Sequence, residues 1–190
     1  HRLDRPTTGA LVFATDQAIA QSLHERFRSH LVTKVYWAVV EGHPKGDAWT
    51  CDEPIRKEPH SPSQAAHTDF RVLARLDESL ALIEAIPKTG RHHQIRRHLL
   101  HAGHPIVGDY RYAGIERSDA WGERLGSGTR MFLHARSLRF THPFDGNELH
   151  IEAPVDSLFR KVCGDRFGDW SKRPQPVSSP EPPAPNYHSW

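Results

Sequence analysis

Apolar residues recur at helical spacing soon after the start of the chain. Ile19, Leu23 and Phe27 stand four positions apart and would line one face of a helix, with charged residues on the other face. Asp16 precedes them and is suited to cap the first turn, because its carboxylate can accept hydrogen bonds from free backbone N–H groups. The pattern predicts a helix that ends near His30.

Runs rich in β-branched and aromatic residues predict the strands of a sheet. Residues 34–42 form one such run and end at a glycine. Residues 68–76 and 80–87 are two further runs, separated by a three-residue polar turn, and predict an antiparallel pair. Two more strands are expected near residues 131–140 and 149–153.

Two more helices are expected, and one segment is irregular. A helix is predicted from about His92 to His101, ended by Gly103, and a short one from Pro154 onward. Proline and charged residues interrupt residues 43–66, where we expect a long excursion with a weak strand near Ile55. The chain is therefore predicted to be an α+β domain with a mainly antiparallel mixed central sheet flanked by helices.

Composition supports one domain followed by a tail. The chain has 190 residues, 37% of them hydrophobic, which is enough for a single core. Six of the 15 prolines fall in residues 171–190, so we expect a disordered proline-rich tail there and a folded domain over residues 1–170. Because the sequence starts at His1 without a methionine, we expect that an N-terminal part is missing.

Composition also excludes several classes of protein. No run approaches the roughly 18 apolar residues of a membrane span, and no secretory signal is recognisable, so we expect a cytoplasmic protein with no membrane partner. Two cysteines are too few for a disulfide scaffold or a thiolate metal cage. We expect a monomer.

The near-neutral total charge hides local polarity. The formal net charge is +2, yet residues 91–117 contain five arginines and two acidic residues, whereas residues 41–60 contain three basic and five acidic residues. This distribution favours a basic cleft that would bind nucleic acid. The alternative is that the arginines are ordinary solvated residues of helix surfaces.

Asp4 is the first candidate for chemistry. It stands between Arg2 and Arg5, ahead of a Pro6–Gly9 turn. Cationic neighbours favour the carboxylate over the acid, so Asp4 should be ionised and available as a nucleophile or base. The alternative, equally weighted, is that Asp4 has no catalytic role and caps the turn by accepting hydrogen bonds from backbone amides.

Three histidines raise the question of a metal. His98, His101 and His104 stand three positions apart, and imidazoles one helical turn apart can share a zinc ion. However, His104 lies beyond the helix end, no cysteine is near, and no HExxH pattern is present. We therefore expect no metal, and expect these histidines to line an RNA-facing surface or to form internal hydrogen bonds.

Tyr36 and Trp37 are adjacent on the predicted strand and must face opposite sides of the sheet. Most such aromatic residues belong to a core. One that faces a cleft would instead stack on a base. We favour Tyr36 for this position because its hydroxyl also needs a polar partner.

Four blocks of the sequence together resemble a known family. They are HRLDRPTTG, KVYWAVVEG, GRHHQIRRHLLHAGHPIVGD and LHARSLRFTHPFDG. In this order they are similar to the signatures of the RluA family of pseudouridine synthases. The departures are small: Thr8 replaces the usual serine and His92 the usual threonine. The resemblance implies the pseudouridine synthase fold and conversion of a uridine in RNA to pseudouridine, with no metal or other cofactor.

The resemblance also implies roles for individual residues. Asp4 would be the catalytic aspartate, Tyr36 the aromatic residue packed on the target base, and Arg96 the arginine paired with Asp4. Arg2 would enter the RNA stack when the uridine leaves it. The remaining residues expected to bind RNA are Arg5, Arg91, His93 and Arg97.

The expected substrate is tRNA rather than ribosomal RNA. The double arginine at 96 and 97, the RMFLHA stretch and the FGDW stretch resemble the tRNA-modifying TruC-type branch, which acts on a uridine in the T stem. A large-subunit ribosomal RNA substrate and a non-catalytic RNA-binding module are alternatives. A further alternative is a nucleoside hydrolase or glycosidase that uses Asp4 and Asp109 as paired carboxylates, although Asp109 follows Gly108 in a turn and suits a structural role.

Overall fold

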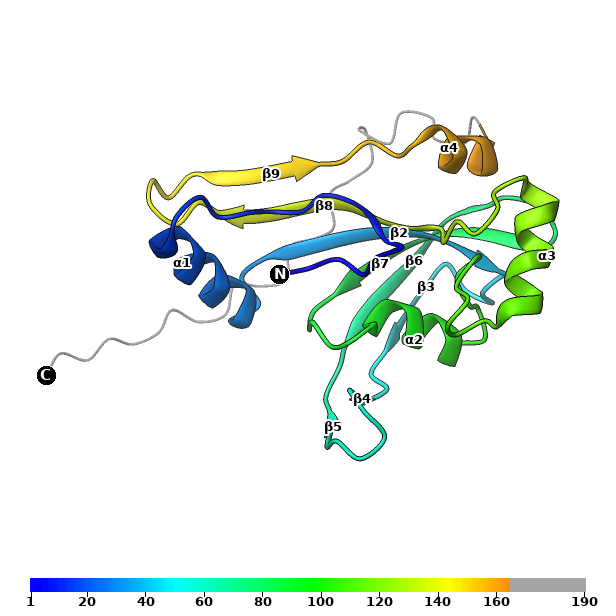
Figure 1. The fold of residues 1–190 in the computed structure, drawn as a ribbon, viewed down its shortest axis with the longest axis horizontal. Helices are drawn as coiled ribbons and strands as arrows, with labels where there is room; N and C mark the ends of the chain where they lie inside the picture. The colour runs from blue at the N-terminus through cyan, green and yellow to red at the C-terminus, as the bar shows by residue number, and fades with distance from the viewer. Residues whose placement is uncertain (165–190) are drawn as a thin grey trace, which may run out of the picture.

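A mixed β-sheet forms the centre of the protein (Figure 1). The computed structural model describes residues 1–164, and the sheet within them has seven strands. These are β1 (Thr8–Gly9), β2 (Thr33–Glu41), β3 (Ala48–Cys51), β6 (Thr68–Arg75), β7 (Leu80–Pro87), β8 (Leu133–Thr141) and β9 (Glu148–Glu152). Their order is β1-β8-β2-β7-β6-β3, and β9 also pairs with β8. Only β1 and β8 pair in parallel, so the predicted fold class is confirmed.

Helices cover both faces of this sheet. They are α1 (Gln17–Arg28), α2 (Gln94–His101), α3 (Ile115–Leu125) and α4 (Ser157–Cys163). Figure 1 shows α1 and α2 on one side of the sheet and α4 on the other, with α3 at one end. The N-terminal segment, drawn in dark blue, passes on the side of α1 and α2.

The core residues agree with this layering. Ala38 and Ile83 of the sheet pack with Leu99 of α2 in one buried cluster. On the opposite face, Phe132 packs with Phe159 of α4, and their ring centroids are 5.8 Å apart. The alternation of strand side chains therefore places these two clusters on opposite faces of the sheet. A third buried cluster packs Leu23 of α1 with Leu138 and Phe140 of β8.

The segment over residues 43–66 is more regular than predicted. Besides the expected short strand β4 (Ile55–Arg56), it contains β3 and β5 (Ser63–Gln64). Trp49 of β3 stacks on Phe70 at 5.0 Å between ring centroids. Four residues are too few to give a recognisable alternation, and β3 forms because β6 offers it a partner.

Other differences concern helix positions. The sequence pattern predicted no element at residues 115–125, where α3 forms, because only Trp121 and Leu125 of this helix pack on the core. The last helix begins at Ser157 with Asp156 as its N-cap, not at Pro154. α2 begins at Gln94, because His93 adopts the left-handed conformation with φ of 53°.

The predicted domain end near residue 170 and the predicted tail at residues 171–190 lie outside the described residues. Among residues 1–164, no helix has the length and apolar character needed to cross a membrane.

Gly108 offers a test of how tightly the loop after α2 is packed. A Cβ atom there would lie 1.9 Å from the carbonyl oxygen of Arg130, and φ is +77°. Gly103 has a similar φ of +81° but open space around it. We predict that Gly103→Ala lowers the free energy of unfolding by about 1 kcal/mol through backbone strain. Gly108→Ala should cost about 1 to 3 kcal/mol more through the steric clash.

Urea denaturation of both variants measures the difference directly. Equal losses in the two variants would show that the loop can move away from the backbone of Arg130 without cost.

Candidate active site

Two hydrogen bonds of the Thr8 hydroxyl fasten the N-terminal segment to the sheet. The Thr8 hydroxyl donates to Nδ1 of His134 at 2.9 Å and accepts from Nη2 of Arg130 at 3.0 Å. Nε2 of His134 donates to the carbonyl oxygen of Ala153 at 3.1 Å, which fixes the tautomer of its ring. A turn closed by the Thr7 amide and the Asp4 carbonyl at 2.8 Å then places Asp4 beside α2.

Arg96 joins two carboxylates in this part of the protein. Its Nη1 donates to Oδ2 of Asp4 at 2.9 Å. Its Nε and Nη2 donate to the two oxygens of Asp109, each at 2.7 Å. Burial lowers the pKa of the Arg96 guanidinium, but its hydrogen bonds with Asp109 and Asp4 outweigh this effect and raise that pKa. The guanidinium is therefore a fixed cation shared by Asp109 and Asp4.

The two carboxylates differ in exposure. The Asp109 side chain is 1% exposed, whereas the Asp4 side chain is 24% exposed. Both oxygens of Asp109 are occupied by Arg96, so Asp109 is placed to hold Arg96 and not to serve as a second catalytic acid. This arrangement argues against the paired-carboxylate hydrolase. Asp4 is the carboxylate that a substrate can reach.

Tyr36 lies on the face of the sheet that α2 covers. It packs against the cluster that contains Ile95 and Leu99, whereas Trp37 belongs to the core of the opposite face. Burial, together with the negative charge of Asp4, raises the pKa of the Tyr36 hydroxyl to about 12. Tyr36 therefore stays protonated at neutral pH and lies within electrostatic range of Asp4, and its contact with a base stays a prediction.

His93 lies beside Asp4. Its Nε2 is 3.6 Å from Oδ1 of Asp4, and its Nδ1 is 2.9 Å from the hydroxyl of Tyr112. The His93 side chain is only 10% exposed. The sequence placed His93 among residues that bind RNA. The structure makes it a direct neighbour of the candidate catalytic carboxylate, and RNA contact by His93 stays a prediction.

The predicted RNA-binding arginines occupy two kinds of position. Arg2 and Arg5 are exposed, near the candidate catalytic carboxylate in the sequence. Nη1 of Arg97 donates to the carbonyl oxygen of Arg56 at 2.5 Å, and Nε of Arg91 donates to that of Ala65 at 2.9 Å. Arg91 and Arg97 thus fasten the β4–β5 hairpin, which projects from the body of the protein (Figure 1), and their contact with RNA stays a prediction.

The three histidines considered as metal ligands have separate contacts. Nε2 of His98 donates to the carbonyl oxygen of Glu53 at 3.0 Å, and Nδ1 of His104 donates to that of Glu41 at 2.9 Å. His101 is exposed, with its Nε2 4.0 Å from a Glu53 carboxylate oxygen. Within residues 1–164, no three His, Cys, Asp or Glu side chains are grouped so that they could hold a metal ion.

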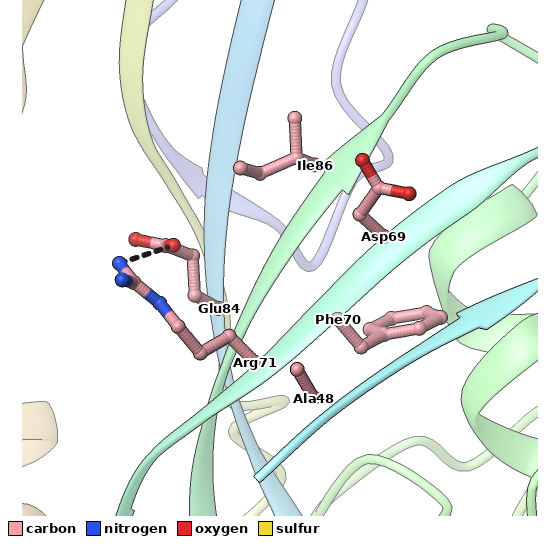
Figure 2. Close-up of a pocket in the computed structure, with 6 residues that line it drawn as sticks. All are labelled: Ala48, Asp69, Phe70, Arg71, Glu84 and Ile86. Atoms are coloured by element: carbon pink, nitrogen blue, oxygen red, sulfur yellow. Dashed lines mark hydrogen bonds and ion pairs between the residues drawn. The ribbon is translucent and has the colours of Figure 1, made fainter. Parts of the chain in front are cut away.

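A shallow pocket of about 210 Å³ lies over β3, β6 and β7 (Figure 2). Its charged groups already have partners: Arg71 donates to Glu84 at 2.7 Å, and Asp69 is 3.1 Å from Nζ of Lys88. Glu84 is opposite Trp37 in the β2–β7 register, so it points to the face away from Tyr36. This pocket is separate from the Asp4 site.

Sequence and structure comparisons both find pseudouridine synthases. Residues 1–101 match the family described as RNA pseudouridylate synthase. The chain is 37% identical over 188 residues to tRNA pseudouridine synthase C of Vibrio cholerae serotype O1, covering 88% of this chain and 76% of that protein. It is 39% identical over 171 residues to ribosomal large subunit pseudouridine synthase C of Yersinia pestis, covering 84% of this chain and 52% of that protein.

The chain therefore spans about half the length of the ribosomal relative and about three quarters of the tRNA relative. Among solved structures, human RNA pseudouridylate synthase domain containing 4 superposes with a TM-score of 0.72 at 30% identity. That match covers 85% of this chain and 72% of the human chain.

The buried pair of Arg96 and Asp109 can be tested by stability measurements. Removing one partner of a buried ion pair leaves an uncompensated charge, so we predict that Asp109→Ala lowers the free energy of unfolding by about 3 to 5 kcal/mol. Asp47 is the matched control, because its side chain is 83% exposed and pairs with Arg75 at 3.0 Å. Asp47→Ala should cost about 1 kcal/mol or less.

Both values come from urea denaturation at neutral pH. A loss for Asp109→Ala that is no larger than the loss for Asp47→Ala would mean that the buried pair stabilises the fold no more than an exposed pair does.

Proposed function

Because this chain belongs to the RNA pseudouridylate synthase family, we propose that it isomerises a uridine in RNA to pseudouridine, with Asp4 as the catalytic residue. The observation that carries this proposal is the contact of 2.9 Å between Asp4 and Arg96, in a site where Asp4 stays partly accessible. A carboxylate paired with a guanidinium stays ionised at neutral pH and keeps a fixed orientation.

The reaction makes few demands on the protein beyond this group. The bond between N1 of uracil and C1′ of ribose breaks, the base turns over in the site, and a bond forms between C5 and C1′. C5 then loses its proton and N1 gains one, so that the product is an isomer of the substrate. Asp4 can either attack the nucleoside or remove a ribose proton, and each route needs an ionised carboxylate beside the sugar. Holding the detached base in place supplies the proximity that makes the second bond form.

Tyr36 and Arg2 have proposed roles in handling the base. Moving a uridine out of the stack costs a few kcal/mol, which contacts in the site must offset. Tyr36 would pack on the everted base, since aromatic stacking of this kind contributes about 1 to 3 kcal/mol. Arg2, which is exposed, would occupy the space that the base leaves in the RNA.

We propose tRNA as the substrate, at a uridine of the T stem, in the cytoplasm. The support is the likeness of the sequence around Arg96 and Arg97 to the tRNA-modifying branch. Percentage identity does not separate the two relatives, at 37% and 39%. Ribosomal RNA is therefore the second substrate to assay.

The decisive variant is Asp4→Asn, which keeps the size of the side chain and removes its charge. We predict that it lowers pseudouridine formation by about 100-fold or more while RNA affinity is largely retained. The control is Asp47→Asn, which removes an exposed carboxylate. Asp47 immediately precedes β3, the edge strand at the opposite end of the sheet from β1, so this variant should leave activity unchanged. The assay uses a tRNA transcript and a large-subunit ribosomal RNA fragment, with pseudouridine mapped by chemical labelling and reverse transcription.

Product from the ribosomal fragment alone would overturn the tRNA proposal. Binding of RNA without product from wild-type protein would indicate a binding module. Equal product from wild type and Asp4→Asn would remove Asp4 from the mechanism.

A further inference from the structure

Tyr112 contacts both of the side chains that hold Asp4. Its hydroxyl is 2.9 Å from Nδ1 of His93, and the guanidinium carbon of Arg96 lies 4.9 Å from the centre of its ring. Arg96 binds Oδ2 of Asp4, and His93 faces Oδ1. One aromatic residue is therefore in contact with the partner of each oxygen of the candidate catalytic carboxylate.

The loop that carries Tyr112 is itself fixed by the buried carboxylate. Oδ1 of Asp109 accepts from the backbone amides of Arg111 at 3.2 Å and Tyr112 at 3.3 Å, in addition to its bond from Arg96. Gly108 before it has no room for a side chain. The position of Tyr112 is thus coupled to the same Asp109 that holds Arg96.

The neighbours of the two ring nitrogens decide which nitrogen of His93 carries the proton. If Nδ1 donated to the Tyr112 hydroxyl, the lone pair of Nε2 would face the Asp4 carboxylate at 3.6 Å, which is repulsive. If the Tyr112 hydroxyl donates to Nδ1, the proton lies on Nε2 and points to Oδ1 of Asp4. The second arrangement is the one that the charges favour.

The backbone conformation of His93 directs its side chain toward Asp4 and Tyr112. It precedes α2 with φ of 53°, a left-handed conformation that is uncommon for a residue with a side chain and is typical of functional sites. Its ring also stacks on His92, with centroids 3.8 Å apart.

We propose that Tyr112 is a positioning residue for the isomerase reaction, and that it acts by orienting His93 so that Nε2–H faces Oδ1 of Asp4 while its ring supports Arg96. This inference rests on the proposed function. Because Arg96 binds Oδ2 closely and His93 lies further from Oδ1, the two oxygens are inequivalent, and Oδ1 is the one left free to react.

The charged groups around His93 agree with a neutral imidazole. Burial is the largest effect and lowers the pKa of His93 to about 4. Asp4 opposes this shift, and Arg96, His92 and Arg111 add to it. Above about pH 5 the ring is therefore uncharged in the folded protein, with Nδ1 accepting from Tyr112.

The first test is Tyr112→Phe, which removes the hydroxyl and keeps the ring beside Arg96. The matched control is Tyr110→Phe on the same loop, whose hydroxyl donates only to the exposed Asp119 at 2.6 Å. We predict that Tyr112→Phe lowers kcat about 10-fold with little change in KM, because it disturbs orientation and not RNA binding. Tyr110→Phe should match wild type in both parameters.

The same variant should leave the ring of His93 neutral. Burial is the largest cause of the lowered pKa of His93, and Tyr112→Phe removes neither the burial nor the charge of Arg96. The kcat of Tyr112→Phe should therefore stay about 10-fold below that of wild type at both pH 8 and pH 6, with no added step from His93. His93→Gln keeps an N–H near the position of Nε2 and should retain more kcat than His93→Ala.

A measurement without RNA separates this inference from the proposed function. Long-range ¹H–¹⁵N NMR spectra of the histidine rings should show His93 of the wild-type protein as a neutral Nε2–H tautomer from pH 8 to pH 6. In Tyr112→Phe the ring should stay neutral, and the Nδ1 resonance should shift because Nδ1 no longer accepts a hydrogen bond from Tyr112. An Nδ1–H tautomer in wild type, or titration near pH 6.5, would overturn the inference even if the enzyme is active.

Activity gives the complementary result. Wild-type activity together with an unchanged kcat for Tyr112→Phe refutes the positioning role alone. Failure of wild type to act on either RNA refutes the proposed function, and the NMR spectra still decide how His93 is held.

Discussion

The whole site depends on one guanidinium shared by two carboxylates. Burying Arg96 without a partner would be costly, and Asp109 offsets that cost with two parallel hydrogen bonds of 2.7 Å. These bonds orient the guanidinium, so the remaining nitrogen, Nη1, points to Asp4. Asp109 thus fixes the place of a carboxylate that it does not touch.

The fold brings these residues together from three distant parts of the chain. Parallel pairing of β1 with β8 and the hydrogen bonds of Thr8 bring the N-terminal segment to the sheet. Ile95 and Leu99 bury one side of α2 against the same face, which leaves Arg96 directed toward Asp4. Gly108 allows the loop that carries Asp109 to pass close to the backbone of Arg130. Each contact limits how far Asp4 can move from Arg96.

The sequence was informative where a pattern is local. Runs of β-branched and aromatic residues predicted β2, β6, β7 and β8, and the amphipathic spacing predicted α1. The resemblance to the family brought Asp4, Arg96 and Tyr36 into one expected site. β3 and α3 were not predicted, because β3 is short and α3 packs on the core through few residues. Their stability comes from neighbours that are distant in the sequence.

The supporting residues were hidden for a similar reason. The sequence offered Asp109 as a second carboxylate or as a structural residue of a turn, without its bond to Arg96, and Tyr112 was not singled out. Their importance comes from contacts with Arg96 and His93 across a loop and a helix, which no periodicity records. The left-handed backbone of His93, which sets the first residue of α2, likewise has no signal in the local sequence.

The most direct test of this account is a crystal structure of the protein with a uridine-containing RNA stem–loop. The account predicts one everted uridine whose ribose lies about 3.5 Å from the Asp4 carboxylate, with the Asp4–Arg96 bond intact and Tyr36 against the base. A complex in which every nucleotide stays stacked, or in which Arg96 leaves Asp4 to bind a phosphate, would contradict it.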